Sequence, residues 1–280
     1  MSHARVSTMV NGEPTGVIDV SDRGLQYGDG LFETIAVRHG QPQHWDRHLQ
    51  RLRRGCERLA ITMPPIGQLN DEAQQMSAGL ERVVLKLILT RAGSLRGYRA
   101  DAAVGPNRIW QVFSWPAQPD GHAREGVRAC VCRTRLARQP VLAGLKHLNR
   151  LEQVLARAEW QQEYDEGLML DSDNNVVEGV SSNLFLFSNG TLMTPMLDRC
   201  GVEGITRERV LDAARLLSWP VHECRLSLGQ LLAADEIFLT NTLIGIWPIR
   251  QIDVDPPATP SHTFAVGPHT RRLREQIDHD

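Results

Sequence analysis

The chain has 280 residues, of which 41% are hydrophobic and 23% are charged, and its formal net charge is -2. These values are typical of a soluble globular protein and exclude a disordered or fibrous chain. Basic and acidic residues are interspersed, so we expect no binding of nucleic acid or of a membrane, and we expect the partner to be a small molecule.

Two further features of the composition concern the compartment. No apolar run approaches the length of a membrane span, and the first residues lack the apolar core of a signal peptide. The five cysteines are odd in number and scattered, which fits neither a disulfide framework nor paired zinc sites. We therefore expect a cytoplasmic protein whose cysteines are reduced packing residues.

The first elements in chain order predict an α+β unit. The clearest strand covers residues 82–91, in which Val83, Leu85, Leu87 and Leu89 form one wholly apolar face. The other predicted elements of this unit are a hairpin turning at Asn11 and Gly12, a strand at 31–37, a helix at 47–59 and a strand at 109–113.

Residues 115–121 contain two prolines and a glycine, which indicates a linker. We predict a first domain of residues 1–114, a linker of residues 115–122 and a second domain of residues 123–280. The predicted elements of the second domain are a strand at 127–133, a helix from residue 148, hairpins turning at 173–175 and 188–190, a helix at 206–217, a strand at 236–240 and a helix at 271–277.

Lys146 is the most informative residue of the chain, because it stands just before an amphipathic helix. Leu151, Val154 and Leu155 recur there at helical spacing, and Asn149 with Glu152 is predicted to form a capping box. A firmly packed helix would hold the lysine, and desolvation would lower the pKa of its amine enough for nucleophilic or proton-transfer chemistry. The alternative for any lone lysine is a side chain that snorkels from a helix start.

Two more segments suit a phosphorylated aldehyde cofactor. Glu178 precedes an apolar strand, and a carboxylate there could keep a pyridine nitrogen protonated. Its alternative is an exposed glutamate in a turn. Residues 201–207 form a glycine-punctuated loop that enters a helix, with Thr206 as the N-cap, and backbone N–H groups at such a start receive phosphates. A plain helix cap explains Thr206 equally well when that residue is taken alone.

Two metal-like patterns do not hold. His44 and His48 have the spacing of two zinc ligands on a helix, but Trp45 stands where a zinc protease has its glutamate, and no third ligand follows. Residues 171–175 begin like a calcium loop but lack its glycine and its final carboxylate. No metal site is therefore expected.

Taken together, these residues resemble the branched-chain aminotransferase-like family of pyridoxal phosphate enzymes, called fold type IV. Residues 21–34, with the sequence SDRGLQYGDGLFET, are similar to the family's N-terminal motif, and residues 48–52 are similar to the helix whose arginine holds the cofactor phosphate. The resemblance implies an α+β or α/β fold of the D-amino acid aminotransferase type. It consists of a small α/β domain and a larger β-barrel-like domain with helices, which carries the Schiff-base lysine. It also implies a homodimer.

The same resemblance implies roles for individual residues. The implied cofactor is pyridoxal 5'-phosphate, bound covalently by Lys146 and contacted at its pyridine nitrogen by Glu178. Four residues are implied to hold its phosphate: Arg51, Ile205, Thr206 and Thr242. The expected substrate-binding residues are Arg96, as a carboxylate clamp, Asn149 and Phe32.

Within the family, residues 143–155 and 96–98 are similar to those of a lyase that releases pyruvate from a cyclic dicarboxylate. One alternative is an aminotransferase for branched-chain or D-amino acids on the same fold. An alternative of another class is a non-catalytic protein that binds a small ligand.

Overall fold

The computed structural model describes residues 5–93, 97–100, 104–117, 121–254 and 261–278. The chain divides into two compact units, Met1–Ala117 with Leu145–Asn149, and Gln118–Gly144 with Arg150–Asp280. The domain boundaries predicted from the sequence place Lys146 in the second domain, whereas its contacts in the structure group it with the first unit. The reason is backbone pairing with a strand of that unit, described below. The domain boundaries predicted from the linker remain a proposal.

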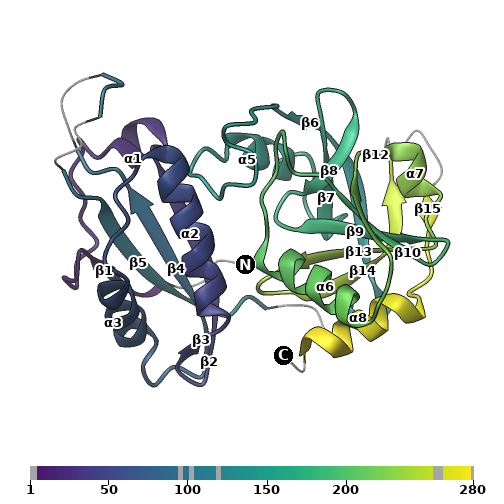
Figure 1. Ribbon diagram of the computed structural model, residues 1–280, viewed down its shortest axis with the longest axis horizontal. Coiled ribbons are helices and arrows are strands. Elements are labelled where there is room, and N and C mark those ends of the chain that lie inside the picture. Colours follow the sequence, from purple (N-terminus) through teal and green to yellow (C-terminus); the bar gives the residue numbers. More distant parts are fainter. Residues whose placement is uncertain (1–4, 94–96, 101–103, 118–120, 255–260, 279–280) are drawn as a thin grey trace. The chain divides into compact units, whose positions relative to one another are not determined.

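The first unit is an antiparallel sheet of five strands in the order β1-β5-β4-β2-β3. The longer helices α2 and α3 pack on it, and Figure 1 shows α2 lying across the sheet. Its elements are β1 (Arg5–Val10), α1 (Arg23–Tyr27), β2 (Gly30–Arg38), β3 (Gln41–Pro42), α2 (Trp45–Leu59), α3 (Ile66–Ser77), β4 (Arg82–Thr90) and β5 (Asn107–Ser114).

The core of the first unit lies between the sheet and these two helices. Leu85, Leu87 and Leu89 of β4 are fully buried, in one cluster with Leu52 of α2 and Leu69 of α3. Because side chains alternate along a strand, these three residues share one face. The apolar face predicted for this strand is therefore confirmed as the face that the helices cover.

For the hairpin predicted at Asn11 and Gly12, the turn is correct but the predicted pairing of the strand before it is wrong. The turn itself is present, because Val10 and Glu13 pair across it and the two central residues have φ values of 54° and 92°. However, β1 pairs with β5, about a hundred residues later in the chain. A turn motif fixes the local path of the chain but not the partner of the strand before it.

The second unit contains a ten-stranded sheet. Its elements are α4 (His122–Glu125), β6 (Val127–Leu136), α5 (Leu151–Arg157), β7 (Glu166–Asp171), β8 (Asn175–Gly179), β9 (Asn183–Ser188), β10 (Thr191–Pro195), α6 (Ile205–Leu216), β11 (Val221–Cys224), β12 (Leu226–Ser227), α7 (Leu228–Leu232), β13 (Glu236–Asn241), β14 (Gly245–Asp253), β15 (His262–Thr263) and α8 (Pro268–Asp278). Both predicted hairpins, β7–β8 and β9–β10, are confirmed.

This sheet closes on itself, as the predicted barrel-like domain requires. The strands β9, β13, β14, β6, β7 and β8 follow one another, and β8 pairs back to β9 through Glu178 and Asn183. Along β9, Leu184 and Leu186 belong to the interior cluster, while the intervening Phe185 faces α6 and α8. Figure 1 shows these two helices against the sheet. Glu178 therefore lies where the barrel closes.

Helix α5 begins differently from the prediction. Its N-cap is Arg150, without a side-chain capping bond, so the predicted capping box is wrong. The Asn149 amide instead donates to the Gly28 carbonyl at 3.1 Å. Glu152 accepts a hydrogen bond from the Ala137 N–H at 2.9 Å. Both side chains thus have tertiary partners that compete with local capping.

The apolar residues of α5 are not packed as predicted. Leu151, Val154 and Leu155 are 69%, 62% and 53% exposed, whereas Ala156 on the other side of the helix is buried. The helix therefore rests on the sheet by a small residue and presents three large apolar side chains outward. It does not hold Lys146 in the way that the sequence suggested.

The cysteines were predicted to be packing residues. All five cysteines are free, and Cys56, Cys130, Cys132 and Cys200 are buried, which confirms that they are packing residues. Within the described ranges, no helix is both long and apolar enough to cross a membrane.

Candidate cofactor-binding site

Lys146 is fixed by the backbone of β2. The Phe32 N–H donates to the Lys146 carbonyl at 2.9 Å, and the Leu148 N–H donates to the Gly30 carbonyl at 3.0 Å. This first part of β2 is free for such pairing because β3 covers only the far end of the strand. Strand-like pairing with β2 therefore fixes Lys146, a role that we predicted for the packing of the following helix.

The Phe32 ring lies close to both lysines of the chain. The Nζ of Lys146 is 4.4 Å from the ring centroid, and the Nζ of Lys86 is 5.4 Å from it. Burial lowers the pKa of the Lys86 amine. The negative face of an aromatic ring attracts an ammonium group, so Phe32 offers a favourable contact to both amines when they are protonated.

Arg51, the predicted phosphate ligand, contacts a buried carboxylate. Its Nε donates to Glu33 Oε1 at 2.9 Å, its Nη2 donates to Glu33 Oε2, and His48 Nδ1 lies 2.6 Å from the same Oε2. Burial alone would raise the pKa of Glu33, but the Arg51 charge and the His48 hydrogen bond lower this pKa to about 2. Glu33 is therefore ionised at neutral pH, and it orients both neighbours.

We expect Glu33→Gln to change how the stability of the chain depends on pH. The carboxyl has a folded-state pKa of about 2, below its ordinary value of 4.5, so the unfolded chain binds the proton more readily. The stabilisation is therefore fully present above about pH 4.5 and is lost as the pH falls toward 2. Urea unfolding between pH 6 and pH 3 should show a lower stability at pH 6 and a shallower acid slope for the variant. Glu13→Gln, at an exposed position of the same unit, serves as the control. Equal slopes for wild type and Glu33→Gln would contradict the prediction.

Glu178 is 4% exposed, so the alternative of an exposed turn glutamate is wrong. Its Oε2 accepts a hydrogen bond from the Val202 N–H at 2.9 Å and one from Asn183 Nδ2 at 3.3 Å. Asn183 Nδ2 also donates to the Val202 carbonyl at 2.8 Å. The carboxylate is thus fixed between β9 and the loop at 201–204.

The same loop leads into α6, whose start differs from the prediction. Gly204 is the N-cap, with extended backbone angles and no side-chain cap, so the N-cap role predicted for Thr206 is wrong. A Cβ at Gly204 would lie 2.0 Å from Asn183 Oδ1, so a larger residue there would displace the Asn183 side chain. Ile205 and Thr206 are the first two helical residues, and their side chains are buried. A helix start without a side-chain cap suits an anion such as phosphate.

Thr242 lies in the turn between β13 and β14. Asn241 Oδ1 accepts hydrogen bonds from the N–H groups of Leu243 and Ile244, both at 2.9 Å, and this shapes the turn. Asn241 Nδ2 donates to the Ser181 carbonyl at 3.1 Å, which ties this turn to the one that follows Glu178. The structure thereby places the Thr242 turn, Glu178 and the α6 start in one connected part of the second unit.

The segment before Lys146 is joined to the same loop. The Gly144 N–H donates to the Gly201 carbonyl at 2.9 Å, and the Glu203 N–H donates to the Gly144 carbonyl at 3.0 Å. Gly144 has a φ of +80°, which favours glycine. The loop next to Glu178 therefore also fixes the backbone that enters the lysine segment.

Two buried side chains of the second unit, Glu166 and Thr240, were not predicted as site residues. Glu166 Oε2 accepts hydrogen bonds from the Ser181 hydroxyl at 2.7 Å and the Ser182 hydroxyl at 3.0 Å, and so supports the turn between Glu178 and Asn183. Within the described chain, Thr240 Oγ1 and His48 Nε2 are buried without hydrogen-bond partners. The sequence indicated His48 only as one of two histidines at zinc-ligand spacing and as part of residues 48–52, which resemble the phosphate-binding helix.

The predicted substrate-binding residues include Arg96 and Asn149. Arg96 lies outside the described residues, so its position is not part of the structure. Asn149 is exposed, and its amide contacts the Gly28 carbonyl.

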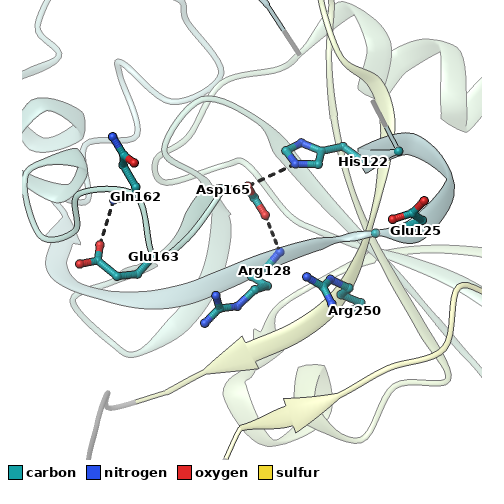
Figure 2. Close-up of a pocket in the computed structure, with 9 residues that line it drawn as sticks. His122, Glu125, Arg128, Gln162, Glu163, Asp165 and Arg250 are labelled. Carbon is teal, nitrogen blue, oxygen red and sulfur yellow. Dashed lines mark hydrogen bonds and ion pairs between the residues drawn. The ribbon is translucent and has the colours of Figure 1, made fainter. Parts of the chain in front are cut away.

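A separate pocket of about 340 Å³ in the second unit contains none of the predicted site residues. Figure 2 shows the guanidinium groups of Arg128 and Arg250 on its lining, together with the carboxylates of Glu125, Glu163 and Asp165. The lining thus carries side chains of both charge signs. Within the described residues, no cluster of histidine, cysteine and acidic side chains could hold a metal ion.

The chain matches the family described as amino-transferase class IV over residues 30–252. It is 35% identical over 272 residues to the aminodeoxychorismate lyase of Vibrio harveyi, with 96% of this chain and 98% of the relative covered. The solved structure of the 4-amino-4-deoxychorismate lyase from Pseudomonas aeruginosa matches with a TM-score of 0.92 and 49% identity, covering 98% of each chain. The branched-chain amino acid aminotransferase of Escherichia coli matches with a TM-score of 0.84 and 26% identity, covering 99% of this chain and 94% of that chain.

These similarities confirm the fold class predicted from the sequence, that of the aminotransferase-like fold type IV enzymes. The family match spans both units, from the start of β2 to β14. The chain therefore belongs to the amino-transferase class IV family.

Proposed function

We propose that this chain is a pyridoxal 5'-phosphate-dependent lyase that converts 4-amino-4-deoxychorismate to 4-aminobenzoate and pyruvate, a step of folate synthesis. The observation that carries the proposal is the 49% identity, over 98% of both chains, to a structure named as 4-amino-4-deoxychorismate lyase. The Vibrio harveyi relative has the same named activity and also spans nearly the whole chain. The branched-chain and D-alanine aminotransferases that match over most of this chain are 30% and 27% identical, below both lyase values, and a branched-chain aminotransferase that is 39% identical covers only 48% of this chain.

Several side chains of this chain suit this cofactor. Glu178 is a buried carboxylate suited to hold a proton on a pyridine nitrogen. The α6 start, with Ile205 and Thr206, is not capped by a side chain and suits the phosphate, which we propose is also held by Arg51 and Thr242. Only Leu145 separates Lys146 from Gly144, and Gly144 is bonded to the loop that holds Glu178.

The proposed chemistry assigns proton transfers to Lys146. The bound cofactor supplies an electron sink. Lys146 would hold the cofactor covalently, and its amine, once free, would take the proton from the substrate carbon that bears the nitrogen. The resulting ammonium protonates the departing enolpyruvyl oxygen, and loss of that group makes the substrate ring aromatic. No second substrate is required, which separates this lyase from an aminotransferase.

We propose Arg96 as the clamp for a substrate carboxylate, with Phe32 and Asn149 beside the substrate ring. A guanidinium binds a carboxylate through two parallel hydrogen bonds, and the Phe32 ring lies next to two lysine amines. The Arg96 guanidinium would therefore favour a substrate with a second carboxylate over the apolar side chain of a branched-chain amino acid.

The assay for this function is incubation of the purified protein with 4-amino-4-deoxychorismate, made in situ from chorismate by its synthase. We expect 4-aminobenzoate and pyruvate in equal amounts without a keto acid acceptor. Arg96→Ala should lose most of this activity, because an unpaired substrate carboxylate is costly in a partly desolvated site. Arg99→Ala, at an exposed position nearby in sequence, is the control. A far higher specificity constant for leucine or D-alanine with 2-oxoglutarate would instead establish an aminotransferase.

We further propose a cytoplasmic homodimer, for which the five free cysteines and the outward face of α5 are the support. Leu151, Val154 and Leu155 form this α5 face, and contiguous exposed apolar residues mark association surfaces. The double variant Val154→Glu/Leu155→Glu is expected to sediment as one chain, while wild type sediments as two. Leu216→Glu, at a 77% exposed position of α6, should leave the wild-type mass unchanged. A wild-type monomer would refute the dimer, and a dimeric double variant would refute this interface.

A further inference from the structure

His48 is a buried histidine with one ring nitrogen unused. It is 0% exposed, and its Nδ1 lies 2.6 Å from Glu33 Oε2. Because Glu33 is ionised, this contact fixes the tautomer in which Nδ1 carries the hydrogen. The other nitrogen, Nε2, has no hydrogen-bond partner in the part of the chain that the structure describes. Buried polar atoms are nearly always paired, so an unpaired nitrogen here points to a group that is bound in use.

The charges around His48 indicate which kind of group would bind at Nε2. The charged neighbours that act on the ring are Glu33 of β2, Arg51 of the same helix, and Lys146. The Arg51 charge is already balanced by Glu33, with which it makes two hydrogen bonds. A phosphate dianion bound by Arg51 would therefore bring negative charge that this buried acid-base pair does not compensate.

We propose that His48 is a further cofactor-binding residue, which takes up a proton at Nε2 when the cofactor phosphate binds beside Arg51. The inference rests on the proposed function, in which Arg51 holds that phosphate. The proton comes from solvent, and the imidazolium formed donates through Nε2 to a phosphate oxygen while Nδ1 continues to donate to Glu33. No other bond changes.

The state of the ring without the cofactor agrees with this assignment. Burial is the largest effect, and it lowers the pKa of His48, as do the charges of Arg51 and Lys146, while Glu33 acts in the opposite direction. The imidazole is therefore neutral at pH 7. A bound anion would add an opposing charge at short distance and raise the pKa, which produces proton uptake.

The test measures protons rather than turnover. Pyridoxine 5'-phosphate is the probe, because it has an alcohol in place of the aldehyde and cannot link to Lys146. Calorimetric titration at pH 7 in two non-phosphate buffers of different ionisation enthalpy gives both the dissociation constant and the number of protons taken up. We expect wild type to take up about one proton more per bound ligand than His48→Asn. Pyridoxine, which lacks the phosphate, should show no such difference.

Two variants distinguish proton uptake at Nε2 from the hydrogen bond that His48 Nδ1 donates to Glu33. In His48→Asn the amide nitrogen takes the place of Nδ1 and keeps a donor for Glu33, but Nε2 is gone. In His48→Gln the amide nitrogen reaches the place of Nε2 and can donate to phosphate without titrating. We expect His48→Asn to bind pyridoxine 5'-phosphate roughly tenfold more weakly, and His48→Gln to recover part of this loss without proton uptake.

A direct measurement supplements the calorimetry. In protein with 15N-labelled histidine, the Nε2 signal of His48, identified by its loss in His48→Asn, should move from an unprotonated to a protonated position when the probe binds. Binding to wild type with no change at His48, and with proton uptake equal to that of His48→Asn, would overturn the inference and leave the proposed function intact. Failure of wild type to bind the probe would refute the proposed cofactor itself, and this inference with it.

Discussion

Lys146→Ala is expected to abolish turnover while the chain still folds. The hydrogen bonds that fix this segment to β2 use backbone groups of Lys146 and Leu148, so alanine preserves them. The variant loses the amine that we propose as covalent ligand and proton carrier, which is expected to lower the rate by at least about three orders of magnitude. It should still bind the cofactor noncovalently through Arg51 and the α6 start. Lyase assays measure the turnover of the variant, cofactor titration measures its noncovalent binding, and thermal unfolding shows that it folds.

Lys86 provides the matched control, because its amine is also beside the Phe32 ring. Borohydride reduction of the cofactor-loaded protein, followed by peptide mapping, is expected to label Lys146 alone. Lys86→Ala should keep the covalent label and the absorbance band of the bound cofactor. A label on Lys86, or retained activity in Lys146→Ala, would contradict the assignment.

The sequence predicted β4 from the alternation of its apolar residues, and it also predicted the helix α2; the structure confirms both. The same reasoning failed for the packing of α5. Its leucines and valine recur at helical spacing, yet they are exposed. Periodicity indicates which residues share a face, but it does not reveal whether that face meets the core of the same chain or another partner. Lys146 is held instead by pairing with β2, for which the sequence carries no local signal.

The start of α6 illustrates a second limit. Threonine is a favoured N-cap, so Thr206 was the natural choice from local propensity. In the structure Asn183 fills the space beside Gly204, and the helix begins one residue before Thr206. The buried acids were missed for a similar reason. Glu33 and His48 are 15 residues apart, and so are Glu166 and Ser181, so each contact depends on the tertiary fold.

Glu178 and Arg51 are expected to affect different quantities, because we propose different atoms of the cofactor as their partners. Glu178→Gln keeps an oxygen that accepts from the Val202 N–H but cannot hold a proton on the pyridine nitrogen. We therefore expect proton abstraction to slow by roughly two or more orders of magnitude, with a much smaller change in cofactor affinity. Single-turnover rates at saturating cofactor, compared with cofactor dissociation constants, measure the two effects separately.

Arg51→Ala is expected to show the reverse pattern, with cofactor affinity weakened by roughly tenfold to a hundredfold through a lost charge-assisted contact. This substitution also leaves the buried Glu33 carboxylate without its guanidinium, which lowers stability by itself. The double variant Arg51→Ala/Glu33→Gln removes that second effect, and its cofactor affinity should remain weak while much of the stability returns. If Glu178→Gln and the Arg51 variants changed rate and affinity in equal proportion, the two proposed roles would not be distinct. A double variant with wild-type affinity would show that Arg51 supports the fold and does not bind the phosphate.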